Sequence, residues 1–249
     1  MKYSIDEYAH QSQMNKWNST LKMFFSIAII IISISSSNFI VPLFIAVFMC
    51  VITVLIGKIK FNVYLRFLMI PAVFLVLGGF AIMAEISVDG GLYFGLENIL
   101  RAVNVTSKAV GAVSAMIMLS LSTPISEVIT VLGKLKVPPP LTDLMHLMYR
   151  YIFIIFDCNI KMKNAATARM GYKNYGTSIK TFGLIAGNLF IVSLHRANEY
   201  YNAIESRCAS PQMKFWTKKK PVKIKHFLFF FGFTIIFILV EVIIRVNAN

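Results

Sequence analysis

Hydrophobic residues are gathered into five long runs along the chain, and more polar stretches of very different length separate them. Each run approaches the roughly 20 apolar residues that a helix needs to cross a bilayer. The runs cover residues 21–37, 39–57, 64–86, 105–123 and 226–246. This pattern predicts an all-α polytopic membrane protein with about five transmembrane helices.

The first run ends in small residues, which is also typical of a secretory signal peptide. A signal peptide, however, begins with a short and positively charged segment. Here about 20 residues of mixed charge precede the run, and they include Asp6 and Glu7. We therefore interpret the first run as a membrane span that follows an amphipathic N-terminal segment.

The long stretch between the fourth and fifth runs is strongly basic. Residues 134–225 contain 16 Lys or Arg and four acidic residues, so this stretch carries +12 of the net charge of +14. Lys58 and Lys60 make the loop between the second and third runs basic as well. Because positive charge beside membrane spans marks the cytoplasmic side, we predict a multi-pass plasma-membrane protein. Its N-terminus and basic domain face the cytoplasm, and its C-terminus lies outside.

These patterns divide the chain into three parts. Residues 1–123 hold the N-terminal segment and four spans, residues 124–225 form a cytoplasmic domain, and residues 226–249 form the last span. Helical periodicity in the middle part predicts helices over 125–135, 141–170 and 180–207, joined by links rich in Pro, Gly and polar residues. Thr123 with Pro124 is expected to cap the first of these helices, and Thr142 the second. The domain should thus consist of two or three long helices.

Each of the two longest predicted helices ends in an arginine. Arg169 follows Ala168, and Arg207 follows Ser206, 38 positions further along the chain. A cation is favoured at a helix C-terminus by the helix dipole. This effect alone would explain why each arginine stands at a helix end. Small flanking residues would also let a helix end enter a groove, where a guanidinium binds a carboxylate through two parallel hydrogen bonds. Both interpretations stay open on this evidence.

Several kinds of chemistry have no support in the sequence. No G-x-x-x-x-G-K-[ST] segment is present, so the chain lacks that device for holding ATP. The three cysteines lie far apart, and His195 with Glu199 would form only half of a metal site. We expect no catalytic residue, no cofactor and no metal site, and we expect no nucleic-acid partner. The chain should not be an enzyme.

Five short segments together resemble a known family, the transmembrane T component of energy-coupling-factor transporters, and specifically its CbiQ branch of cobalt importers. They are Ile5 to Ser12, Trp17 to Lys22, Thr123-Pro124, Leu132 to Pro138 and Met148 to Phe153. Arg169 and Arg207 stand where the family carries two short Ala-Arg-Gly motifs at the ends of its coupling helices. The chain departs from these motifs, because Gly171 comes one place late and Cys208 replaces the second glycine.

The resemblance implies a scaffold and permease role in an importer for cobalt ions. A dimer of CbiO-like P-loop ATPases would bind the coupling helices, and a CbiM-like membrane subunit with a small CbiN-like partner would bind the metal. The expected ATPase-coupling residues are Ala168, Arg169, Met170, Gly171, Ser206, Arg207 and Cys208. A T component for nickel, biotin or other vitamins is an alternative. A basic membrane scaffold without a transport role is another.

Overall fold

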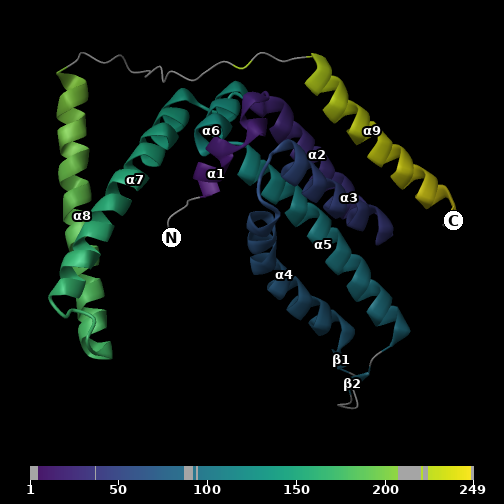
Figure 1. Cartoon of the computed structure of the whole chain (residues 1–249), viewed down its shortest axis with the longest axis horizontal. Coiled ribbons are helices and arrows are strands. Elements are labelled where there is room, and N and C mark those ends of the chain that lie inside the picture. The colour runs from purple at the N-terminus through teal and green to yellow at the C-terminus, as the bar shows by residue number, and fades with distance from the viewer. Residues whose placement is uncertain are drawn as a thin grey trace. The chain divides into compact units, whose positions relative to one another are not determined.

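The computed structural model describes residues 5–36, 38–86, 92–93, 95–206, 220 and 224–247. The chain packs into two compact units. The first, here called the bundle unit, comprises residues 1–128 and 218–249, and the second, the hairpin unit, comprises residues 129–217. The described elements are almost all helices (Figure 1), which confirms the all-α class.

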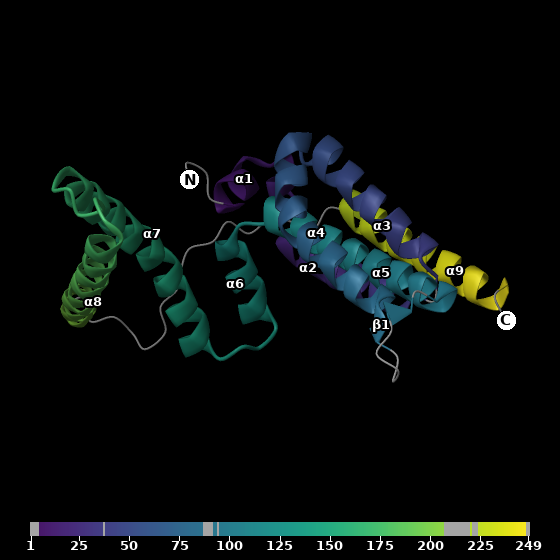
Figure 2. The ribbon, with the colours of Figure 1, turned by 90° about the horizontal axis from the view of Figure 1, so that it is seen from below.

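The bundle unit is built around one long central helix. Its elements are α1 (Ile5–Gln11), a 3₁₀ turn (Gln13–Lys16), α2 (Ser19–Ser35), α3 (Ile40–Val51) with a π-helical turn (Ile52–Ile56), α4 (Phe61–Met83), β1 (Glu85–Ile86), β2 (Leu92–Tyr93), α5 (Leu96–Ser122), the first turn of α6 (Ile125–Lys134) and α9 (Ile224–Asn247). Helix α5 packs against α2, α3 and α4, and α9 packs against α2 and α3 (Figures 1 and 2). The two short strands pair antiparallel between α4 and α5.

The core of the bundle lies where α2, α3, α5 and α9 meet. Ile29, Ile45 and Met118 are fully buried there, and Phe230 of α9 packs on Phe25 with ring centroids 4.6 Å apart. At Gly111, the middle of α5 approaches its neighbours so closely that a Cβ would lie 2.5 Å from the Ser33 hydroxyl oxygen. The opposite, outward faces carry large exposed apolar side chains, which suits contact with lipid.

The five predicted hydrophobic runs correspond to α2, α3 with its π-helical turn, α4, α5 and α9. Among the described residues, three helices are long and apolar enough to cross a membrane, namely α4, α5 and α8 (Tyr175–Glu205). Shorter apolar helices cover Ser19–Ser35, Ile40–Ile56 and Phe227–Ile243. Helix α8 differs from the sequence prediction, which counted it with the basic domain and not among the spans.

The hairpin unit consists of the end of α6, α7 (Pro139–Ala168) and α8. Helices α7 and α8 run antiparallel and pack together, with the rings of Tyr151 and Tyr200 5.6 Å apart. The Thr181 hydroxyl of α8 donates a hydrogen bond of 2.8 Å to the carbonyl of Gly171 in the connecting turn. No residue of α7 or α8 is buried. The two helices therefore present most of their side chains outward.

The predicted helix starts in the basic segment need three corrections. The N–H of Ile125 in α6 binds the Asp6 carboxylate at 3.0 Å, whereas Thr123, the predicted cap, closes α5 instead. Helix α7 starts at Pro139 with Pro138 as its N-cap, so Thr142 lies inside the helix. Helix α8 starts five residues before the predicted position. The reason is a capping box in which the side chains of Asn174 and Thr177 satisfy each other's backbone N–H groups.

The predicted domain limits at residues 123 and 225 rest on charge and on position relative to the bilayer. The two compact units are defined by packing alone, and their limits lie at residues 128 and 218. The assignment of residues 124–225 to the cytoplasm stays a prediction.

Candidate functional site

Helix α7 ends in a hydrogen-bonded stop around Arg169. Arg169 is the C-cap, the N–H of Met170 binds the Thr167 carbonyl at 3.1 Å, and the N–H of Gly171 binds the Ala166 carbonyl at 2.8 Å. Met170 has a φ of 59°, in the left-handed region. This pair of bonds with a left-handed residue after the cap is the Schellman motif. The helix therefore ends at a fixed place, with Arg169 at its tip.

The motif gives a physical account of the displaced glycine. Glycine is usual at the left-handed position because it lacks a Cβ, but here Met170 occupies that position. Gly171 is needed for another reason, since a Cβ there would lie 2.9 Å from both the Ala166 carbonyl oxygen and the Thr181 hydroxyl oxygen. The glycine thus allows the turn to approach α8.

Arg169 and its neighbours form an accessible tip. Arg169, Ala165, Ala168 and Met170 are all exposed, and Met170 exposes 72% of its surface. Arg169 forms no ion pair with another residue in the described ranges. A small, exposed helix end with an available guanidinium can bind a carboxylate supplied by another molecule.

The second predicted motif is described only in part. Ser206 is the C-cap of α8, and its hydroxyl donates to the Ala203 carbonyl at 3.2 Å. Arg207 and Cys208 lie outside the described residues. Ser206 stands at the opposite end of α8 from the turn that holds Arg169, and a helix of 31 residues is roughly 45 Å long. The two motifs therefore belong to opposite ends of one long helix.

A polar cluster in the bundle unit, here called the clasp, joins three distant segments of the chain. Its members come from the segment before α2 and the start of α2, from the end of α5 and the first turn of α6, and from a position four residues before α9. They are Asn15, Asn18, Ser19, Lys22, Ser122, Glu127 and Lys220. Lys220 forms an ion pair with Glu127, and Ser19 donates a hydrogen bond to the same carboxylate. The clasp thus holds together the segments through which the chain leaves the bundle unit and returns to it.

Lys22 lies at the centre of the clasp and is fully buried. Its amino group donates to the Ser122 carbonyl at 2.6 Å and to the Met14 carbonyl at 3.1 Å. Ser122 is the last residue of α5, where backbone carbonyls lack partners within the helix. Lys22 therefore supplies a donor to the end of the central helix.

Sequence reasoning missed the clasp. The available signal was the position of Lys22, a charged residue at the start of a hydrophobic run, since such residues are rarely left without partners. Its partner Ser122 is 100 positions away, and Lys220 is 93 positions from Glu127. No local pattern indicates pairs so far apart.

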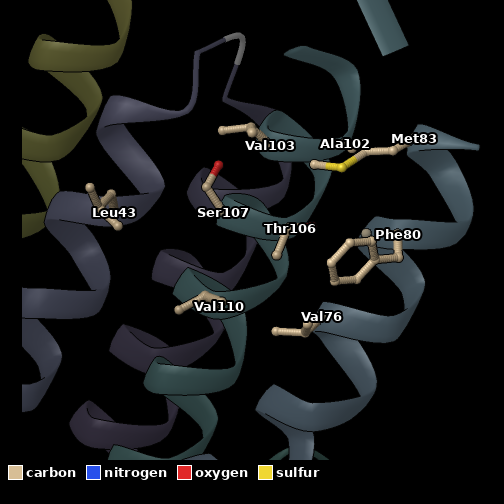
Figure 3. Close-up of a pocket in the computed structure, with 10 residues that line it drawn as sticks. Leu43, Val76, Phe80, Met83, Ala102, Val103, Thr106, Ser107 and Val110 are labelled. Atoms are coloured by element: carbon tan, nitrogen blue, oxygen red, sulfur yellow. The ribbon is translucent and has the colours of Figure 1, made fainter. Parts of the chain in front are cut away.

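The bundle also contains a hollow of about 340 Å³ between α3, α4 and α5. Figure 3 shows Leu43 of α3, Phe80 and Met83 of α4 and Thr106 of α5 pointing toward it. Its lining is mostly apolar, and such a surface suits an apolar group better than a hydrated cation. Within the part of the chain that the structure describes, no group of three or more His, Cys, Asp or Glu residues could hold a metal ion.

Comparison with known proteins identifies the family. The family model of the CbiQ cobalt transport protein matches residues 10–216, which includes α2 to α8 and most of the clasp. The chain belongs to the CbiQ cobalt transport protein family. Membership confirms the resemblance carried by the five short segments. It makes the chain a permease component of cobalt transport.

Relatives of this CbiQ family member span most of its length. A protein of Methanocaldococcus jannaschii, uncharacterized protein MJ1089, is 30% identical, and the match covers 96% of this chain and 93% of that protein. The putative fused cobalt transport protein CbiMQ of Methanocorpusculum labreanum is 29% identical over 82% of this chain, which corresponds to 36% of the longer fused protein. The cobalt transport protein CbiQ of Salmonella typhimurium is 28% identical over 56% of this chain and 68% of its own length.

Proposed function

We propose that this CbiQ family member is the transmembrane coupling component of an energy-coupling-factor importer for cobalt ions. Two partner ATPases bind the ends of α7 and α8 through Arg169 and Arg207. A separate membrane subunit carries the metal. Hydrolysis of ATP moves the two helix ends, and the bundle unit passes that movement to the metal-binding subunit.

The end of α7 carries this proposal. The Schellman motif fixes the helix stop, and Arg169 is exposed there after Ala168, without an ion-pair partner among the described residues. The separation of roughly 45 Å along α8 between the two motifs favours two binding grooves, one on each ATPase, over a single groove.

The composition and packing of α7 and α8 support a location for these two helices at the membrane boundary on the cytoplasmic side. Helix α7 carries Arg150, Asp157, Lys161 and Lys163 and is not apolar enough to count as a span. Helix α8 is apolar enough, but it packs along α7. Because the two helices form one hairpin, we place both outside the bilayer core, on the side that the basic loops indicate.

A CbiM-like membrane partner is supported by two observations. The fused relative from Methanocorpusculum labreanum carries CbiM and CbiQ in one name. In this chain, the hairpin helices expose large apolar side chains, including Phe156 at 52%, Phe182 at 71% and Phe190 at 65%. Exposed apolar patches of this kind mark protein or membrane contact sites. We assign the small CbiN-like partner to the same assembly by family membership alone.

The arginines provide the decisive test. Truncating one partner of a buried, hydrogen-bonded charge pair costs about 2–5 kcal/mol, whereas a surface ion pair contributes about 0–1 kcal/mol. Arg169→Ala and Arg207→Ala should each weaken co-purification of the ATPases or uncouple hydrolysis from cobalt uptake. The double variant should abolish uptake while the protein still inserts into the membrane. Lysine at either position should rescue only in part, because it lacks the planar fork.

Lys173→Ala is the matched control, since this exposed cation lies four residues beyond Arg169. It should leave uptake and co-purification close to those of the unchanged protein. Normal uptake and intact ATPase binding in both arginine variants would contradict the coupling role. They would favour a membrane scaffold without a transport role.

A further inference from the structure

A second hollow in the bundle unit has a lining of different chemistry. It measures about 390 Å³ and lies between α1 and the loop that joins the π-helical turn to α4. Lys58 and Lys60 line it together with the polar side chains of Tyr8, Gln11 and Ser12 and the apolar side chains of Ile59 and Val63. Among the described residues, the lining contains two cations and no acid. Its charge therefore complements an anion.

The loop that presents the two lysines is held in place by the N-terminal segment. The Gly57 carbonyl accepts a hydrogen bond of 3.2 Å from the buried Ser12 hydroxyl and one of 3.3 Å from the N–H of Gln13. Lys58, the next residue, has a φ of 53°. A residue other than glycine in this region is strained, and such strain persists only where the surroundings enforce it. The lysines are thus positioned before any ligand arrives.

Neither lysine has an acidic partner among the residues that the structure describes. In the described ranges, the ion pairs join His10 to Asp6 and Lys220 to Glu127. Lys58 and Lys60 are both exposed. Two cations with accessible ammonium groups beside one hollow repel each other, and an anion bound between them would remove that repulsion.

The helix α4, which lines one side of the hollow at Val63, carries a surface suited to an acyl chain. Val63 of its lining, Ile70 and Phe74 lie on one face of α4, because they are spaced by seven and four residues. Ile70 is 73% exposed and Phe74 is 75% exposed. Arg66 lies on the same face between Val63 and Ile70. Beyond this third cation, an apolar strip runs along the helix away from the two lysines. A ligand with a phosphate at one end and a hydrocarbon chain at the other matches both features.

We infer that this hollow binds the phosphate group of an anionic phospholipid from the leaflet on the side that the basic loops indicate. The ammonium groups of Lys58 and Lys60 hold the phosphate, and the polar side chains of α1 complete the headgroup site. The acyl chains lie along α4. The bound lipid would fasten the N-terminal segment, and with it the clasp, to the membrane surface.

The test measures lipid binding to the purified full chain in neutral detergent by native mass spectrometry. Phosphatidylglycerol, phosphatidylcholine and inorganic phosphate serve as the three probes. We expect saturable binding of phosphatidylglycerol and much weaker binding of the other two. Each lysine near an anionic lipid contributes about a five-fold change in affinity, so Lys58→Gln with Lys60→Gln should weaken phosphatidylglycerol binding about 30-fold. Arginine at both positions should keep it.

Lys161→Gln with Lys163→Gln is the matched control, since it removes two exposed lysines with the same spacing from α7. This control should bind phosphatidylglycerol as the unchanged chain does. Unchanged binding in the Lys58 and Lys60 double variant, or an equal loss in the control, would overturn the site. Equal binding of phosphatidylcholine would overturn the charge argument. Binding of inorganic phosphate as tight as that of phosphatidylglycerol would overturn the assignment to a lipid.

Discussion

Replacement of Lys22 by methionine tests the clasp at its centre. Methionine has nearly the same length and shape as lysine but donates no hydrogen bond, so the packing of this fully buried side chain is preserved while both of its hydrogen bonds are lost. The Met14 carbonyl keeps a second donor, the N–H of Trp17 at 3.0 Å. The Ser122 carbonyl at the end of α5 loses a bond of 2.6 Å in a buried place.

The expected cost follows from these two acceptors. Leaving a buried acceptor unsatisfied costs about 1–3 kcal/mol, and losing one ordinary hydrogen bond costs about 0.5–1.5 kcal/mol. Part of this cost is offset, because burial of a methionine side chain carries no desolvation penalty for an amino group. We expect Lys22→Met to lower the free energy of unfolding by about 2–3 kcal/mol.

Unfolding of the chain in mixed micelles by denaturant or heat measures this difference. Lys16→Met is the matched control, because Lys16 lies six residues before Lys22 but is exposed. The control should change the free energy of unfolding by less than about 0.5 kcal/mol. A Lys22→Met variant as stable as the Lys16→Met variant would refute the argument that Lys22 satisfies the end of the central helix.

Two further predictions concern the hairpin and the orientation. Met170→Gly should raise the free energy of unfolding by about 0.5–1 kcal/mol, because glycine relieves the strain of the left-handed backbone where α7 ends. The control Met148→Gly, inside α7, should lower the free energy of unfolding by a similar amount. Destabilisation by Met170→Gly would contradict the Schellman assignment. In a chain without its native cysteines, an impermeant thiol reagent applied to intact cells should label a cysteine placed at Asp89 but not one placed at Lys218. Labelling at Lys218 would reverse the proposed orientation.

The end of α7 shows how much of the candidate site can be predicted from local sequence. Arg169 was predicted at a helix end from its small neighbours and the glycine beyond it, and the structure places it as the C-cap. The different roles of Met170 and Gly171 could not be predicted in the same way. They depend on Thr181 of α8, which approaches the turn from the next helix. The role of Arg207 as a second contact point stays a prediction, because Arg207 lies outside the described residues.

The sequence by itself determined the class of the protein and the approximate positions of its long helices. Hydrophobic runs and helix stops act over a few neighbouring residues, so α2, α4, α5 and α9 could be predicted from their own segments. Only the tertiary structure decided the contacts between distant segments. Asp6 caps α6 from 119 positions away, Lys22 reaches the end of α5 from 100 positions away, and the N-terminal segment holds the loop that presents Lys58. These contacts depend on how the helices pack, and packing brings together polar groups that no local pattern relates.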